Sequence, residues 1–82
     1  MSITYTESNL KNKVRTTVRI SKLLYSYRFI CFLKQRSDFN FKEANRQNYV
    51  FYYYGTVENA EFYFKLHLAT WRNMQKRVNL KG

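Results

Sequence analysis

The chain has 82 residues, of which 15 are Lys or Arg and 5 are Asp or Glu, so its formal net charge is +10 at pH 7. This length suits one basic domain, residues 1–82, and a hydrophobic content of 45% excludes a disordered basic tail. No apolar run reaches about 18 residues, which excludes a membrane-spanning helix. The first residues lack the features of a signal peptide and Cys31 is the only cysteine, so we expect a reducing, cytoplasmic location.

Residues 9–25 are predicted to form an amphipathic helix. Leu10, Val14 and Val18 recur every four residues, which is typical of one helical face, and Thr6 or Ser8 would cap the first turn. The basic residues of the segment follow the spacing i, i+4, i+8 and i+11. They would form a basic stripe: Lys11, Arg15, Arg19 and Lys22.

This basic stripe predicts an anionic partner. Like charges four residues apart destabilise a helix by roughly 0.2–0.5 kcal/mol per pair, so helix stability alone does not favour the pattern. No Asp or Glu occurs between Ser8 and Ser37, which leaves that part of the chain with one sign of charge. Nucleic acid, an acidic protein surface and an anionic membrane all match this charge. The alternative is a solvated basic face without a partner.

Residues 27–35 and 49–54 are predicted to be the two strands of an antiparallel hairpin, because both are rich in β-branched and aromatic residues. The polar segment 36–48 would be a long hairpin loop. Within it, Phe39 and Phe41 either extend the first strand or form a short third one.

Alternation along residues 49–54 separates two sets of side chains. One face would present Val50, Tyr52 and Tyr54, and the other Tyr49, Phe51 and Tyr53. We expect one set to lie in the core and the other to offer a contact surface.

A second helix is predicted to begin after Thr56, a good N-cap, with Glu58 and Glu61 near the positive end of the helix dipole. Its core stripe would consist of Val57, Ala60, Phe64, Leu68, Trp71 and Val78. A second apolar strip, Phe62, Leu66 and Ala69, lies on the opposite side. A second set of basic residues, Lys65, Arg72 and Lys76, lies between the two. Because the second strip cannot face the same core, we expect a homodimer or an obligate partner there.

The predicted fold is α+β in the order helix, strand, strand, helix, with a small antiparallel hairpin sheet and two helices. Both strands are apolar on both faces. The sheet face without helices therefore needs the loop, a second copy or a partner protein to cover it.

Candidate catalytic groups are few: His67, Cys31 and five carboxylates. His67 lies near the edge of the core stripe, so we expect a packed structural histidine, and Cys31 is expected to be a small core residue. Asp38, Glu43 and His67 would converge only if the loop folded back over the second helix, which we do not expect. We therefore predict no enzyme, no metal site and no cofactor.

The run Tyr49–Gly55, followed by Glu58-Asn59-Ala60-Glu61 and then Tyr63 and Leu66, resembles the end of an uncharacterised phage and bacterial domain family. The likeness extends over residues 27–78, implies a phage or mobile-element origin, and brings no known activity.

The predicted function is non-enzymatic binding of nucleic acid or a nucleoprotein through basic helix faces. The contact residues would be Lys11, Arg15, Arg19, Lys22, Arg28, Lys65, Arg72 and Lys76. The alternative is a phage-encoded inhibitor that blocks a nucleic-acid-handling protein of its host, and acts in the host cytosol.

Overall fold

The computed structural model describes the backbone of residues 3–81 and the side chains of residues 3–76. The elements follow the order strand, strand, helix, strand, strand, helix. Their bounds are β1 Ile3–Leu10, β2 Lys13–Ser21, α1 Tyr27–Lys34, β3 Asn40–Ala44, β4 Asn48–Tyr53 and α2 Val57–Lys81. The fold is therefore α+β, as predicted, but its sheet has four strands rather than two.

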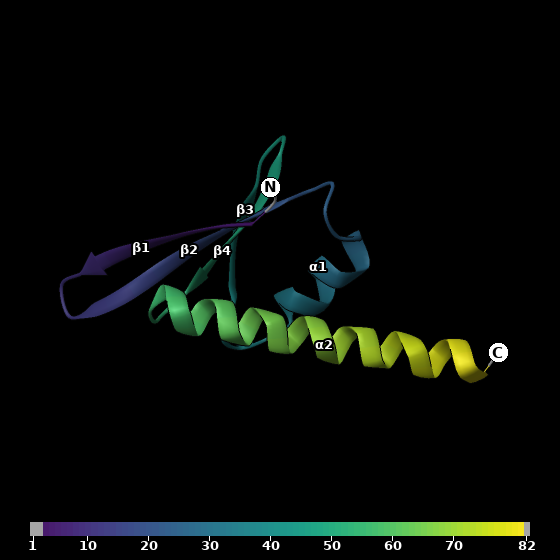
Figure 1. The fold of residues 1–82 in the computed structure, drawn as a ribbon. Helices are drawn as coiled ribbons and strands as arrows, with labels where there is room; N and C mark the ends of the chain where they lie inside the picture. Colours follow the sequence, from purple (N-terminus) through teal and green to yellow (C-terminus); the bar gives the residue numbers. More distant parts are fainter. Residues whose placement is uncertain (1–2, 82) are drawn as a thin grey trace.

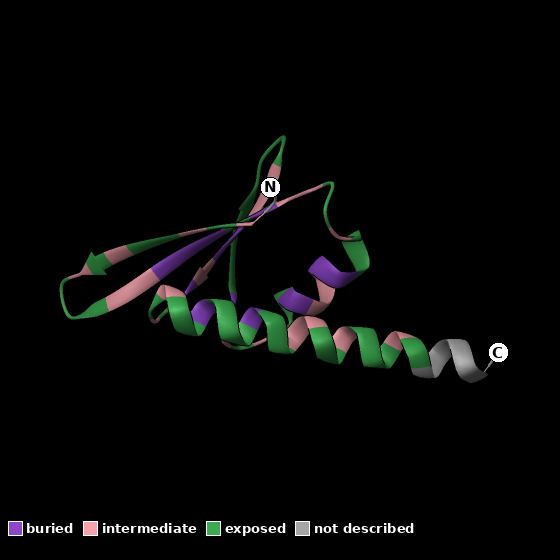
Figure 2. Cartoon of the chain, in the orientation of Figure 1, coloured by how far each residue is buried: buried purple, intermediate pink, exposed green. Residues whose placement is uncertain are grey.

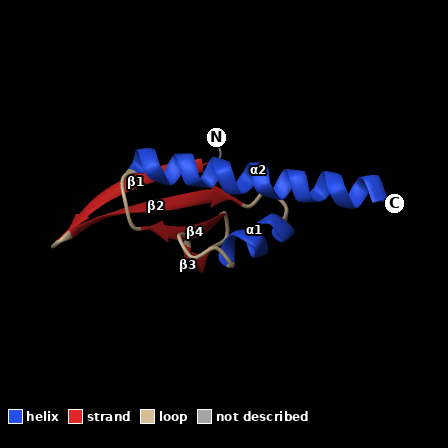
Figure 3. Ribbon diagram, turned by 90° about the horizontal axis from the view of Figure 1, so that it is seen from below, coloured by secondary structure: helices blue, strands red, loops and turns tan. Residues whose placement is uncertain are grey.

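The sheet has the strand order β1-β2-β4-β3, and every neighbouring pair is antiparallel. Both helices lie on the same face of this sheet (Figure 1), and α2 runs past α1 (Figure 3). The molecule measures 50 × 25 × 21 Å, because the β1–β2 turn and the C-terminal half of α2 project at opposite ends (Figure 1). No described element covers the other sheet face, which we call the open face.

The prediction of a helix over residues 9–25 is wrong, because most of this segment belongs to the β1–β2 hairpin, which ends at Ser21. Strand β2 is Lys13–Ser21, and five of its nine residues are β-branched. The spacing of four between Arg15 and Arg19 misled the prediction, since four residues are two full periods of a strand as well as about one turn of a helix. The basic stripe is thus not a helical face.

The prediction of a strand over residues 27–35 is also wrong, because Tyr27–Lys34 form the helix α1. Phe29, Ile30 and Leu33 are buried at helical spacing. Ser26 is the N-cap, and its Oγ accepts a hydrogen bond from the Phe29 N–H at 3.3 Å. Capping and packing thus outweigh the β-propensity of the aromatic and β-branched residues.

The second half of the chain confirms its predicted elements. Strand β4 is Asn48–Tyr53, and α2 begins at Val57. Thr56 caps α2, since its Oγ1 accepts a hydrogen bond from the Asn59 N–H at 3.2 Å. The expected long loop is interrupted by β3, which confirms the short third strand left open by the sequence.

The core lies between the sheet and the two helices, where the buried residues of Figure 2 are found. It consists of Val18, Ile20, Phe29, Ile30, Leu33, Phe39, Phe51, Tyr53, Ala60 and Phe64. Tyr49, Phe51 and Tyr53 are therefore the core face of β4. Leu68 and Trp71 pack against this core, with the Trp71 ring 6.1 Å from that of Phe29. Val78 of the predicted stripe lies outside the described side chains.

Candidate nucleic-acid interface

The open face of the sheet is polar and basic in its central part. Because paired residues of neighbouring strands share a face, the register identifies its members. Arg15 is paired with Ser8, Thr17 with Thr6 and Tyr52, and Arg19 with Thr4 and Val50. Arg19 is exposed, Arg15 is half-buried, and Val50 is covered by its neighbours.

Two cations of the open face lie on tyrosine rings. The guanidinium carbon of Arg15 is 4.0 Å from the ring centroid of Tyr52, and the Lys13 Nζ is 4.7 Å from that of Tyr54. Each contact fixes a flexible cation against a flat apolar surface. The Arg15 Nε is buried and has no hydrogen-bond partner among the described residues. Lys13, Arg15 and their two tyrosines thus form adjacent cation–aromatic pairs near the hairpin.

The acidic residues leave this positive charge largely uncompensated. Glu7 faces the helix layer, and its Oε1 accepts a hydrogen bond from the Val57 N–H at 3.3 Å. Glu61 forms an ion pair with Lys65, and Asp38 contacts the His67 imidazole through both carboxylate oxygens. Glu58 lies in the first turn of α2. Only Glu43 belongs to the open face, where it lies on the edge strand β3 and is paired with Val50 of β4.

The structure divides the predicted basic stripe among three places. Arg15 and Arg19 share the open face, two residues either side of Thr17. Lys11 is exposed in the turn between β1 and β2. Lys22 follows β2, and its Nζ lies 5.3 Å from the ring centroid of Tyr49 on the core face of β4. Two of the four predicted residues therefore form one surface.

The other predicted contact residues belong to the helix layer. Arg28 is exposed on α1, and Lys65, Arg72 and Lys76 are exposed on α2. The fold does not bring these four residues onto the surface of Arg15 and Arg19. Sequence reasoning also missed Lys13 as a site residue, although its alternation with Val14 places it beside Arg15 on a strand.

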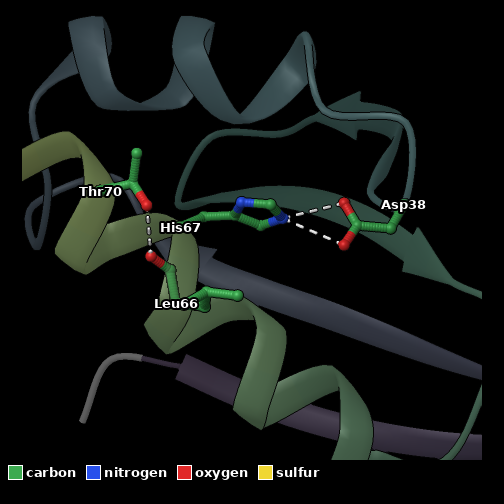
Figure 4. Close-up of polar contacts among 4 residues, drawn as sticks. All are labelled: Asp38, Leu66, His67 and Thr70. Atoms are coloured by element: carbon green, nitrogen blue, oxygen red, sulfur yellow. Dashed lines mark hydrogen bonds and ion pairs between the residues drawn. The ribbon is translucent and has the colours of Figure 1, made fainter.

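A second polar feature joins α2 to the α1–β3 connection. The Nε2 atom of His67 lies 2.9 Å from Oδ1 and 3.0 Å from Oδ2 of Asp38 (Figure 4). Both side chains line a pocket of about 340 Å³, together with Gln35, Arg36 and Ser37. The segment does fold back over α2, contrary to expectation, although Glu43 stays on β3. His67 is thus a hydrogen-bond partner of Asp38 and not only a packing residue.

The described residues contain no group of three or more His, Cys, Asp or Glu side chains arranged to bind a metal ion. Within the same part of the chain, no helix is long and apolar enough to cross a bilayer. Comparison with family models, curated proteins and solved structures gives no match. The resemblance to a phage and bacterial domain family therefore stays a prediction, and the open face is the best-defined candidate site.

Proposed function

We propose that the protein is a non-enzymatic binding protein that holds single-stranded nucleic acid on the open face of its sheet. The observation that supports this proposal best is the pair of adjacent cation–aromatic contacts, Arg15 on Tyr52 and Lys13 on Tyr54. Single-stranded nucleic acid is bound by the combination of a basic surface for phosphates and planar groups on which bases stack.

The open face supplies both components. Lys13, Arg15 and Arg19 lie on one face of one strand, with Lys13 and Arg15 about 7 Å apart along it and Arg15 and Arg19 about 14 Å apart, spacings that suit contacts to different phosphates of an extended strand. Tyr54 is 47% exposed, and the planar guanidinium of Arg15 offers a second stacking surface. Thr4 and Thr6 on the neighbouring strand β1 are exposed and add hydroxyl groups.

Binding of labelled single-stranded DNA and RNA, followed by fluorescence anisotropy between about 50 and 200 mM salt, tests the proposal. Log K falls with log salt, and each lost phosphate contact makes this fall less steep by about 0.7 for single strands. The double variant Arg15→Gln/Arg19→Gln should therefore make it less steep by about 1.4. Tyr54→Ser should weaken binding about fivefold or more with little change in slope, since base stacking contributes about 1–3 kcal/mol.

The matched control is Arg28→Gln/Lys34→Gln, which removes two exposed charges from α1 in the helix layer. It changes the net charge equally and should leave the slope near its wild-type value. The proposal fails if both double variants bind alike, or if the wild type binds neither nucleic acid. If the wild type binds neither nucleic acid, the alternative partner of the same basic face is an acidic protein surface.

A further inference from the structure

Much of α2 is exposed (Figure 2), and large apolar side chains are among its exposed residues. Among the side chains of α2 that the structure describes, four large apolar ones are exposed, by 60% for Phe62, 48% for Leu66, 44% for Met74 and 37% for Tyr63. At about 100° per residue, Phe62, Leu66 and Ala69 lie within a sector of about 60°, opposite the buried Phe64. We call Phe62, Leu66 and Ala69 the outer seam.

Charged residues border one flank of this seam. At the same angular step, they all fall within another sector of about 60°: Glu58, Glu61, Lys65, Arg72 and Lys76. The acidic residues occupy the N-terminal half of this flank and the basic residues Arg72 and Lys76 the C-terminal half. Lys65 lies between them, and its Nζ is 3.1 Å from the Glu61 Oε2.

This charge order is self-complementary in only one helix orientation. In an antiparallel pair the two-fold axis is perpendicular to the helices, so the same flank of both copies lies on one side of the interface. The N-terminal half of that flank in one copy then faces its C-terminal half in the other. Glu61 then faces Arg72 of the second copy and Glu58 faces Lys76, and both pairs share a midpoint at Leu66–His67. A parallel pair has its two-fold axis along the helices, so the charged flanks of the two copies would lie on opposite sides of the interface and could not pair with each other.

We propose that the protein forms a homodimer in which the outer seams of two α2 helices pack antiparallel, with the two-fold axis beside Leu66. Phe62 of each copy then lies next to Ala69 of the other, and the flanking charges pair at both ends. The opposed helix dipoles favour the same orientation. Since both helices lie on the face of the sheet opposite the open face (Figure 1), packing through the outer side of α2 leaves the two open faces free.

Sedimentation of nuclease-treated wild-type protein at about 50 µM should give twice the monomer mass. This result corresponds to a dimer dissociation constant on the micromolar scale. The variant Phe62→Ser/Leu66→Ser should sediment as a monomer. Both side chains are exposed, so circular dichroism of this variant should match that of the wild type.

Charge reversal tests the orientation. Arg72→Glu/Lys76→Glu lowers the net charge, so general repulsion between copies would weaken and dimerisation would strengthen. The antiparallel pairing predicts the opposite, a loss of at least tenfold in dimer affinity, because four acidic groups then meet at each end of the interface. Adding Glu58→Lys/Glu61→Lys to the same chain restores complementarity at the wild-type net charge, and should recover the dimer.

Three results would overturn the proposal: a monomeric wild type at about 50 µM, an unchanged dimer in the seam variant, or a tighter dimer after Arg72→Glu/Lys76→Glu. None of them depends on nucleic-acid binding. The monomeric seam variant should still bind one oligonucleotide per chain through the open face, so failure of one proposal is distinguishable from failure of the other.

Discussion

His67 and Asp38 are 29 residues apart in the sequence, and their side chains meet at 2.9 Å. The contact fastens the middle of α2 to the segment that leads from α1 into β3. Phe39 follows Asp38 directly and is buried, and its ring lies edge-on to the His67 imidazole at 5.6 Å. The contact therefore closes the core over Phe39.

Breaking this pair should destabilise the protein. The His67 and Asp38 side chains are 17% and 32% exposed, so water screens their contact in part. We therefore expect a coupling energy of about 1 kcal/mol. A double-mutant cycle of His67→Gln and Asp38→Asn, measured by urea unfolding near pH 6, gives this value directly. Strictly additive effects of the two substitutions would show that the contact contributes nothing to stability.

The accuracy of the sequence prediction follows from how many local signals agree in each segment. At β4 and α2, composition, the Thr56 cap and apolar spacing all favour the same elements, and both are confirmed. In β2, the spacing of Arg15 and Arg19 fits a helix and a strand equally, and the β-branched residues between them decide for the strand. In α1, aromatic residues favour a strand, but the Ser26 cap and the face of Phe29, Ile30 and Leu33 give a helix.

The candidate site was only partly predictable for a different reason. Arg15 and Arg19 were identified from charge alone, and Tyr52 and Tyr54 were identified as one face of β4. Their meeting depends on β2 pairing with β4, which are separated by α1 and β3, and no local pattern specifies that pairing. The contact between Asp38 and His67 is long-range in the same sense.

Gly55 should not tolerate a side chain. A Cβ atom at this position would lie 2.6 Å from Cε2 of Tyr53, whose ring is buried and packs 5.2 Å from that of Phe39. We expect Gly55→Ala to lower the free energy of unfolding by about 1–3 kcal/mol, because the ring has to move within a packed core. Urea unfolding measures the change. In a Tyr53→Leu background the same substitution should cost less, and an equal cost in both backgrounds would contradict the steric explanation.

Ser26 should be required for the stability of α1. Its Oγ satisfies the Phe29 N–H, so Ser26→Ala should lower the free energy of unfolding by about 0.5–2 kcal/mol. Ser26→Asp keeps an acceptor at the N-cap and adds a negative charge at the positive end of the helix dipole, so it should retain most of the stability. Thermal unfolding of the three proteins tests both expectations. Equal stability of the Ala and Asp variants would mean that the cap is not used.

Tyr5 should make the fold sensitive to alkaline pH. It lies on the helix side of β1, paired with Val18, and it packs against the core. Burial, assisted by the negative charge of Glu61 and by Tyr25, raises the pKa of Tyr5 from 10.0 to about 12.

The sign of the effect follows from proton binding. Below pH 10 the Tyr5 hydroxyl is protonated in both the folded and the unfolded chain, so it adds no pH dependence. Between pH 10 and pH 12 the unfolded chain loses this proton first, so it binds fewer protons than the folded chain and stability falls as the pH rises. Tyr5→Phe keeps the ring and removes the titrating group. Urea midpoints measured at half-unit steps from about pH 9 to pH 11.5 should therefore decline less steeply for Tyr5→Phe than for the wild type. Parallel declines in the two proteins would show that the Tyr5 hydroxyl titrates equally in both states.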